Sequence, residues 1–312
     1  MWRMESEQHN MIVVAGSLNY DIILKVKRMP HEGETMTCES ASTAAGGKGA
    51  NQAVQSAKLG VKTFMIGSVG NDNMGEFLLA EAVKYGLDVS HVKRSSVSSG
   101  MGCIHALEDG RVFATINRGA NYDINTKDID MADELFRQSK ILILQNEIPN
   151  EINIYAAKKA KGYGMKVLYN AAPSFSDRRE VLPLADVVIV NEVEASEYLG
   201  VKISAVDDAV REGLKISASM NNTWVITMGG QGSVICADGK SGIVRPYKVD
   251  AIETTGAGDS YIGGLGYALL HGMDIFTAAK FATKCSAVTV CGIGAQSSMP
   301  TLSQIHEKFG ED

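Results

Sequence analysis

The chain is poor in cysteine, and its cysteines are not arranged for metal binding or disulfide bonding. Only five cysteines and six prolines occur among 312 residues, and no two cysteines form a C-x-x-C pair. An odd number at this spacing argues against a disulfide framework and against a zinc knuckle. There is also no run of about 18 apolar residues, and the first residues, MWRMESEQHN, do not resemble a signal peptide. We therefore expect a cytoplasmic protein with no membrane partner.

An excess of positive charge is also missing. Thirty basic residues stand against 36 acidic ones, which gives a formal net charge of −6. A chain with this balance has no basic stripe for nucleic acid, so we expect no nucleic-acid partner. A phosphate-bearing ligand would need a local site built from backbone amides. Apolar residues make up 45% of the chain, enough for a sizeable core.

Short apolar runs alternate with amphipathic stretches along most of the chain. This alternation predicts an α/β fold with a mostly parallel central sheet and helices on both faces. The runs expected to be buried strands are 12–15, 64–66, 141–144, 167–169, 187–190 and 225–227. The expected helices are 50–59, which Gly60 ends, 75–85, 128–138, 150–161, 193–199 and 206–217, with a further one at 261–270 after a strand at 242–249.

Two stretches interrupt this rhythm and look like antiparallel strand pairs. The first pairs 22–26 with 36–42, and the second pairs 102–107 with 112–117 through a turn at Glu108-Asp109-Gly110. Strands without covering helices need another surface, so they could form a lid over a cleft, a dimer interface, or both. We expect one domain spanning 1–312, with lid strands from about 20–44 and 100–119.

The segment 253–260, ETTGAGDS, is the most informative for chemistry. Glycines at the start of a helix let peptide N–H groups converge on an anion, where the helix dipole is also favourable. A carboxylate in the same turn, Asp259, would repel a phosphate but could accept the proton of an attacking hydroxyl. The amides of Ala257 and Gly258 would then stabilise charge on a transferred phosphoryl group. Taken alone, GAGD is equally compatible with a capped helix and a tight turn.

Two further segments suit a polyol ligand. GGKGAN at 46–51 places Lys48 and Asn51 among small residues, and GSLNYD at 16–21 places Asn19 and Asp21 two apart, on the same side of an extended segment. Carboxylates and carboxamides suit sugar hydroxyls, which both donate and accept hydrogen bonds. A glycine turn with a solvated lysine and a turn rich in Asn and Asp are the competing interpretations.

Together these segments resemble the ribokinase-type carbohydrate kinases, a family that includes fructokinases and adenosine kinases. Four more matches follow in order: Glu147 after LQN, the N-x-x-E pattern at 191–194, TMGGQG at 227–232 and GAQSSMP at 294–300. The resemblance covers nearly the whole chain, from about 14 to 300.

The resemblance implies a role for each matching residue. The sugar would be bound by Asn19, Asp21, Gly47, Lys48, Asn51, Glu147 and Asp259. Asp259 would be the catalytic base, and the amides of Gly256, Ala257 and Gly258 would form the anion hole. ATP would be bound by Asn191, Thr227, Gly229, Gly232 and Gly258. A homodimer through the lid strands is also implied.

The same resemblance implies two metal ions. Asn191 and Glu194 would organise Mg²⁺, through water, although a helix cap and a first-turn acid is the alternative. K⁺ would lie beside the anion hole, with Glu253, Thr255 and Ser298 as candidate ligands. Family members carry Asp where this chain has Glu253. The longer Glu side chain is a departure from the family's K⁺ site.

The implied function is the ATP-dependent phosphorylation of a small sugar, with D-ribose at its 5-hydroxyl as the first candidate. Fructose, deoxyribose, a sugar phosphate or a nucleoside are alternatives within the enzyme class. A sensor that binds sugar without catalysis would be expected to have lost Asp259 or the glycine loop, and neither is lost. An oxidoreductase is disfavoured because no G-x-G-x-x-G follows the first strand.

Overall fold

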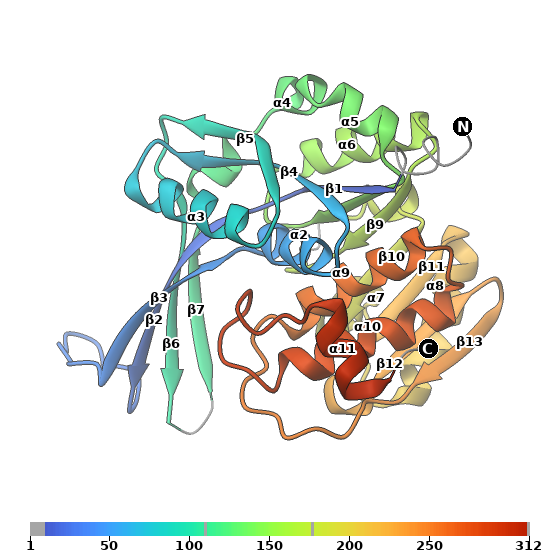
Figure 1. Ribbon diagram of the computed structural model, residues 1–312. Coiled ribbons are helices and arrows are strands. Elements are labelled where there is room, and N and C mark those ends of the chain that lie inside the picture. The colour runs from blue at the N-terminus through green and yellow to red at the C-terminus, as the bar shows by residue number, and fades with distance from the viewer. Residues whose placement is uncertain (1–9, 109–110, 176–177, 311–312) are drawn as a thin grey trace.

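The protein is built on a nine-stranded sheet, seen in a computed structural model that describes residues 10–108, 111–175 and 178–310 (Figure 1). The strand order is β13-β12-β11-β10-β9-β8-β1-β4-β5. Neighbours from β5 to β11 run parallel, and β12 and β13 are antiparallel additions at one edge. The strands are β1 Met11–Ala15, β4 Lys62–Gly70, β5 Asp88–Ser95, β8 Ile141–Gln145, β9 Lys166–Asn170, β10 Val187–Asn191, β11 Thr223–Thr227, β12 Ser233–Ala237 and β13 Lys240–Val244.

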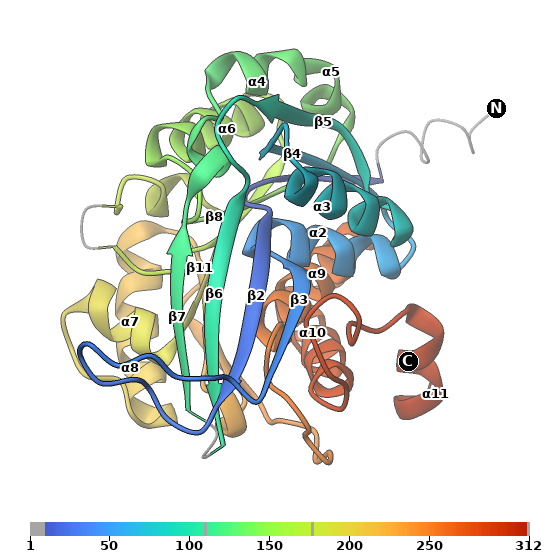
Figure 2. The same ribbon diagram turned by 90° about the vertical axis from the view of Figure 1, so that its left-hand side faces the viewer.

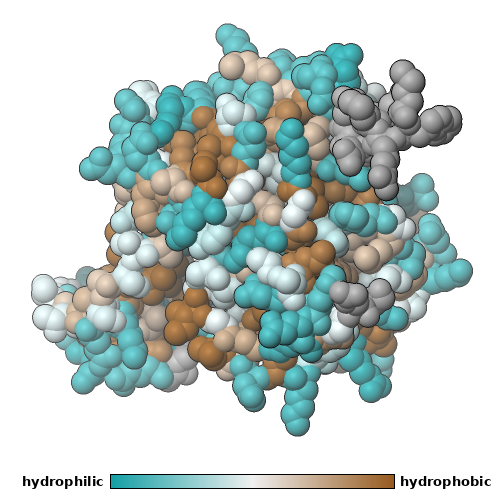
Figure 3. All heavy atoms as spheres, in the orientation of Figure 1, coloured by the Kyte–Doolittle hydropathy of each residue, from teal (hydrophilic) through white to brown (hydrophobic). Residues whose placement is uncertain are grey.

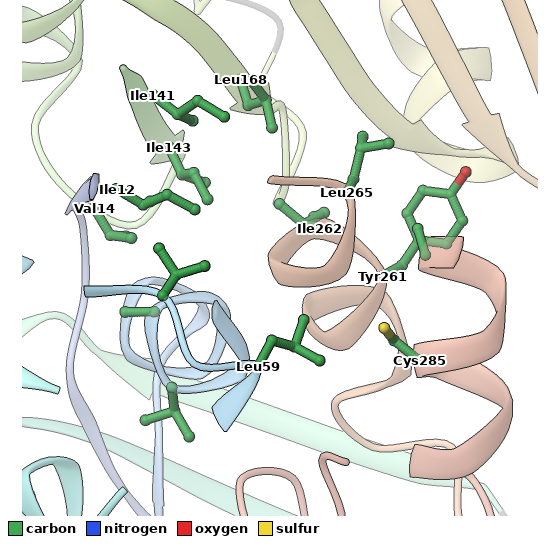
Figure 4. Close-up of a cluster of buried hydrophobic side chains, with 14 of the residues drawn as sticks. Ile12, Val14, Leu59, Ile141, Ile143, Leu168, Tyr261, Ile262, Leu265 and Cys285 are labelled. Carbon is green, nitrogen blue, oxygen red and sulfur yellow. The ribbon is translucent and has the colours of Figure 1, made fainter. Parts of the chain in front are cut away.

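Helices cover both faces of this sheet, because its central strands alternate between two cores. Ile12 and Val14 of β1 face one core, and Val13 and Ala15 face the other. Figure 4 shows the first core, where Ile12 and Ile143 of the sheet lie near Ile262 and Leu265. It is packed by α2 Lys48–Lys58, α3 Asn73–Lys84, α9 Ala257–Leu270, α10 Ile275–Thr289 and α11 Leu302–Phe309. The second core is packed by α4 Thr126–Met131, α5 Asp133–Gln138, α6 Asn150–Gly162, α7 Glu192–Leu199 and α8 Val206–Met220.

A smaller four-stranded sheet extends from the main body (Figures 1 and 2). Its order is β3-β2-β6-β7, from β2 Asn19–Val26, β3 Ser40–Gly46, β6 Gly100–Leu107 and β7 Val112–Asn117. Both expected antiparallel pairs are present, and the parallel pairing of β2 with β6 joins them into one sheet. The predicted α/β fold class and the small additional sheet are therefore confirmed.

Several predicted boundaries were wrong. The strand expected at 36–42 begins only at Ser40 and continues to Gly46, and the one expected at 242–249 ends at Val244. The helix expected at 128–138 is two helices, because the Ala132 N–H donates to the Ile129 carbonyl in a tighter turn. Strands β5 and β12 and helices α10 and α11 are not among the predicted elements. In the 108–110 turn, Asp109 and Gly110 lie outside the described residues, as do residues 1–9 of the N-terminal segment.

Hydrophilic and hydrophobic residues are mixed on the face of the molecule that Figure 3 draws. Figure 3 shows hydrophilic residues spread over this face, with hydrophobic residues scattered between them. Within the described residues, no helix is both long enough and apolar enough to cross a bilayer.

The carboxyl ends of the parallel strands gather at one edge of the main sheet, next to the small sheet. The chain leaves β1 toward β4 on one side, while β8 lies on the other side of β1. Ligands of open α/β sheets bind at such a switch point, outside the carboxyl ends of the strands. Polar residues that end or follow these strands are Ser17, Glu147, Asn170, Asn191 and Thr227.

The approach of α2 to this edge depends on Gly49. A Cβ at Gly49 would lie 2.5 Å from the backbone nitrogen of Ser17, whereas a Cβ at Gly162 in α6 would meet nothing within 4 Å. We expect Gly49→Ala to destabilise the protein by about 1–3 kcal/mol, because backbone atoms must move. Gly162→Ala is the control and should be neutral or stabilise by about 0.5–1 kcal/mol. Urea unfolding measures both, and equal effects would contradict the close approach.

Candidate active site

Asp259 lies in the first turn of α9 and is held by two side chains of α2. Asn51 Nδ2 donates to Asp259 Oδ2 at 2.9 Å, and Gln52 Nε2 donates to Asp259 Oδ1 at 2.9 Å. The carboxyl group is buried, at 8% exposure. Both carboxylate oxygens therefore accept hydrogen bonds, which orient the group.

A network of buried amides supports these two donors. Gln296 donates to Asn51 Oδ1 at 3.1 Å, and Gln145 donates to Gln52 Oε1 at 2.8 Å. Gln52 Nε2 also reaches Asn170 Oδ1 at 3.1 Å. The network ties β8, β9 and the C-terminal loop to the Asp259 carboxylate, so the geometry of this carboxylate is set by several elements at once.

Asn19 and Asp21 lie on the same side of β2, as their spacing predicts, and glycines in the neighbouring strands make room for them. A Cβ at Gly100 would lie 2.5 Å from Asn19 Oδ1, and a Cβ at Gly102 would lie 2.3 Å from Asp21 Oδ1. Gly46 leaves room for Asp21 in the same way, because a Cβ at Gly46 would lie 2.0 Å from Asp21 Oδ2. Gly100 and Gly102 were not singled out from the sequence, although G-x-G at 100–102 matches the two-residue period of β2.

Glu147 joins β1, α2 and β8. Its Oε2 accepts hydrogen bonds from Ser17 Oγ at 2.5 Å and from the Lys48 backbone N–H at 3.0 Å. Gly47, with φ 89°, makes the turn into α2, and a Cβ there would lie 2.8 Å from the Asn19 nitrogen. The predicted sugar-binding residues from three separate segments thus meet at one place.

Four carboxyl groups and one lysine, Lys48, lie in this region. Burial and the nearby charges of Glu147 and Asp259 raise the pKa of Asp21 to about 7. Burial also raises the pKa of Glu194, against the lowering effects of the Asn191 N–H and Lys48. For Lys48 burial disfavours the charge, but Asp259, Glu147 and Glu194 outweigh it and raise the pKa. The site is therefore negative, with Lys48 its central positive charge.

The start of α9 presents free peptide N–H groups. Gly256 has φ 78°, a conformation that favours glycine, and a Cβ added at this position would lie 2.9 Å from Ala295. Ala257 N–H donates to the Thr254 carbonyl at 3.2 Å, whereas no described residue accepts from the N–H groups of Gly256 and Gly258. Of the three predicted anion-hole amides, those of Gly256 and Gly258 therefore have no acceptor among the described residues, and that of Ala257 already donates to Thr254.

Two adjoining cavities flank this turn. The larger, of about 590 Å³, is lined by the glycines after β11 and by α9 and α10, including Thr227, Gly229, Gly232 and Gly258. The smaller, of about 140 Å³, is lined by Lys48, Asn191, Glu194, Gly256 and Asp259. Thr227 and Gly258 line both cavities. A nucleotide in the larger cavity could therefore extend its terminal phosphate toward Asp259.

Asn191 and Glu194 form the helix cap that was the alternative interpretation. Asn191 Oδ1 accepts from the backbone N–H groups of Val193 and Glu194, and Glu194 Oε2 accepts from the Asn191 N–H at 2.8 Å. Capping does not remove them from the cavity, because both still line it beside Asp259. Among the described residues no cluster of three His, Cys, Asp or Glu side chains is suited to hold a metal ion. An ion here would have to use few protein ligands, as Mg²⁺ commonly does.

The candidate K⁺ ligands lie around the C-terminal loop. Glu253 Oε2 accepts from the Gly294 N–H at 2.9 Å, and Ser298 Oγ donates to the Gly294 and Ala295 carbonyls at 2.5 and 3.0 Å. Both side chains thus converge on the same loop, which packs against Gly256. Thr255 is exposed and makes no side-chain hydrogen bond to a described residue.

Residues that sequence reasoning missed are mainly polar groups outside the matching motifs. The Asn121 side chain bonds to Asn19 Oδ1 at 2.7 Å and to both backbone groups of Leu18. Asn121 also lines a third cavity, of about 170 Å³, with Asn19 and Glu147. In the sequence Asn121 stands out only as an asparagine two residues after Gly119. That pattern is too common to predict a binding residue by itself.

This combination of fold, carboxylate, open amides and paired cavities defines a carbohydrate kinase that transfers phosphoryl groups. The chain belongs to the pfkB family of carbohydrate kinases, whose model matches residues 9–302. It is 34% identical to a ribokinase of Haemophilus influenzae, over 95% of this chain and 97% of that one. It is 30% identical to a deoxyribokinase of Salmonella typhi, over 95% and 97%. An Arabidopsis thaliana ribokinase solved with ribose and ATP superimposes with a TM-score of 0.88, at 28% identity, covering 97% of this chain and 100% of that one.

The raised pKa of Asp21 predicts a pH-dependent stability. The folded state holds this proton up to about pH 7, while the unfolded chain loses it near 4. The contribution of Asp21 to stability should therefore fall between about pH 4 and 7 and fall no further above that range. Asp21→Asn removes this loss, so its melting temperature relative to wild type should rise across the same window. A difference that is the same at every pH would contradict the raised pKa.

Proposed function

We propose that the protein phosphorylates D-ribose at its 5-hydroxyl, using ATP to give ribose 5-phosphate and ADP. The observation that carries this proposal is the position of the Asp259 carboxylate, buried next to open peptide N–H groups and within one polar cluster with Asn51 and Lys48. Similarity to ribokinases along nearly the whole chain supports ribose as the sugar. The relative named deoxyribokinase makes deoxyribose the second candidate.

The chemistry follows from the charges around Asp259. Its carboxylate accepts the proton of the sugar hydroxyl as that oxygen bonds to the γ-phosphorus of ATP, while the bond from phosphorus to the ADP oxygen breaks. The free N–H groups of Gly256 and Gly258 and the charge of Lys48 stabilise the transferred phosphoryl group. General-base help of this kind contributes about 10²–10⁴ in rate.

The remaining sugar contacts come from the small sheet and β8. Asn19, Asp21, Gly47, Asn51 and Glu147 bind hydroxyls of the sugar on the side away from ATP. The small sheet acts as the lid over this pocket, within a single domain. Sugar binding also reduces the repulsion within the carboxyl cluster. The hydroxyl groups of the sugar supply hydrogen-bond donors where the protein supplies mostly acceptors.

Thr227, Gly229, Gly232 and Gly258 bind ATP in the larger cavity, and Asn191 lies near its phosphates. Glu194 and Asn191 would hold Mg²⁺ through water, and the ion would neutralise phosphate charge. Glu253, Ser298 and the backbone at Thr255 would hold K⁺ near the anion hole. The convergence of Glu253 and Ser298 on Gly294 supports that assignment.

Assembly and location follow as part of the same proposal. The outer strand β7 exposes Val112 and Ile116 on one face and Phe113 on the other, and these apolar side chains support a homodimer formed through the lid strands. All five cysteines are free, which suits the reducing cytoplasm.

Replacing the base tests the mechanism. Asp259→Asn should lower kcat with ribose by about 100-fold or more, since the amide cannot accept the proton, while titration calorimetry shows ADP binding almost unchanged. The matched control is Asp238→Asn, an exposed turn residue whose positive φ of 50° also suits Asn. Near-normal turnover of Asp259→Asn would refute the base assignment. No sugar-dependent ATP consumption by wild type, over ribose, deoxyribose and fructose, would refute the function.

The cation site has its own test. Exchanging K⁺ for tetramethylammonium should slow ribose phosphorylation severalfold, because a large organic cation cannot fit among oxygen ligands. Glu253→Gln should reduce the dependence on K⁺, while keeping an oxygen to accept from the Gly294 N–H. Rates that are indifferent to the cation would show that this chain has no such site.

A further inference from the structure

The loop that precedes α11, residues 291–301, is connected to Asp259 through two side chains. Gln296 of this loop donates to Asn51 Oδ1 at 3.1 Å, and Asn51 Nδ2 in turn donates to Asp259. The Asn51 amide can present its nitrogen to the carboxylate only if its oxygen faces another donor, and Gln296 is that donor. Contacts that hold Gln296 in place therefore also affect the orientation of Asp259.

Helix α2 holds the loop 291–301 along one face. Gln55 Nε2 donates to the Pro300 carbonyl at 3.0 Å, and Lys58 Nζ donates to the Gln296 carbonyl at 3.1 Å. Asn51, Gln55 and Lys58 are spaced four and three residues apart, which places them on the same side of a helix. Asn51 and Lys58 thus bind the side chain and the backbone of the same residue, Gln296.

Gln296 has only these two hydrogen-bond partners within 10–108, 111–175 and 178–310. Its side chain is buried, and its side-chain oxygen accepts no hydrogen bond from this part of the chain. Its amide is therefore held through Asn51 alone, and its backbone is held through Lys58 alone. Without Lys58, the hydrogen bond to Asn51 would have to keep Gln296 in place by itself.

Lys58 is a partly buried cation, and no carboxylate of the described residues pairs with it. Burial lowers the pKa of Lys58 to about 8, so its ammonium is still mostly charged at pH 7. Its Nζ lies 5.0 Å from the centroid of the Tyr85 ring. The ring and the Gln296 carbonyl are thus the groups that stabilise this charge. A hydrogen bond from a charged donor is stronger than one from a neutral donor, so the carbonyl is held firmly.

Lys58 lines none of the three cavities, so it does not act by contact with sugar or nucleotide. We propose that Lys58 is a positioning residue for the catalytic base. By holding the Gln296 carbonyl, it keeps the Asn51 amide turned toward the carboxylate. This inference rests on the proposed function, in which Asp259 is the base.

The test compares Lys58→Met, which removes the charge, with Lys58→Arg, which keeps it. Lys84→Met is the matched control, because Lys84 is exposed and lies over the same Tyr85 ring but donates to Glu81 and not to the loop. Lys58→Met should lower kcat with ribose by about 3- to 10-fold, as expected for losing part of one charge-assisted hydrogen bond. Lys58→Arg should keep most of the activity, and Lys84→Met should keep all of it.

The KM for ATP separates positioning from a general disturbance of the fold. No residue of α2 or of the loop 291–301 lines the larger cavity, so the KM for ATP should stay at the wild-type value in Lys58→Met. Melting temperatures show that each variant is folded at the assay temperature. If Lys58→Met does not fold, Lys58→Gln, which keeps a neutral donor, is used in its place.

A double-mutant cycle tests whether Lys58 acts through Gln296. Gln296→Ala breaks the connection one residue closer to the base, so adding Lys58→Met to it should lower kcat no further. Independent effects of the two substitutions would overturn the proposal. Wild-type kcat in Lys58→Met, or an equal loss in Lys84→Met, would overturn it as well.

The proposed function and this inference can fail separately. If wild type phosphorylates no sugar, the proposed function fails, and crystal structures of wild type and Lys58→Met decide the positioning role. Loss of the hydrogen bond from Asn51 to Asp259 in the variant would support that role. The same hydrogen bond in both structures would overturn it.

Discussion

The paired hydrogen bonds from Asn51 and Gln52 to the Asp259 carboxylate are the contact on which the site depends. They join α2 and α9, more than 200 residues apart in the chain. Small residues let these helices approach, since a Cβ at Gly263 would lie 2.6 Å from the Gln55 Cβ. Because both amides are fixed by further hydrogen bonds, the carboxylate points toward the sugar pocket and the open amides of α9 before any substrate binds.

This arrangement concentrates negative charge where an anionic nucleotide must come close. Asp21, Glu147, Glu194 and Asp259 would repel a polyphosphate, and Lys48 offsets only part of that repulsion. The open peptide N–H groups at the start of α9 would offset this repulsion by donating hydrogen bonds to the phosphates. Such a local site fits a chain with no overall positive charge. Under the proposed function, the raised pKa values are a structural cost of placing a base and polyol ligands in one pocket.

Much of the fold could be predicted, because parallel strands buried on both faces appear as apolar runs, as in Ile12–Ala15. Strand β5, DVSHVKRS, mixes charges with apolar residues and gave no such run. The site motifs were found because glycines and acids cluster after strands. Gln52 and Asn121 were missed, because an isolated polar residue in a helix or loop is expected to face solvent until the tertiary structure shows that it is buried. Helix capping by Asn191 and Glu194 was correctly kept as an alternative.

The central claim is that one carboxylate, Asp259, meets the attacking hydroxyl beside the open amides of α9. A crystal structure with ribose and a non-hydrolysable ATP analogue tests this most directly. The account predicts an Asp259 oxygen within about 3.2 Å of the 5-hydroxyl, with that hydroxyl facing the γ-phosphorus. Ribose bound with its 5-hydroxyl away from Asp259, or a γ-phosphate far from Gly256 and Gly258, would contradict it.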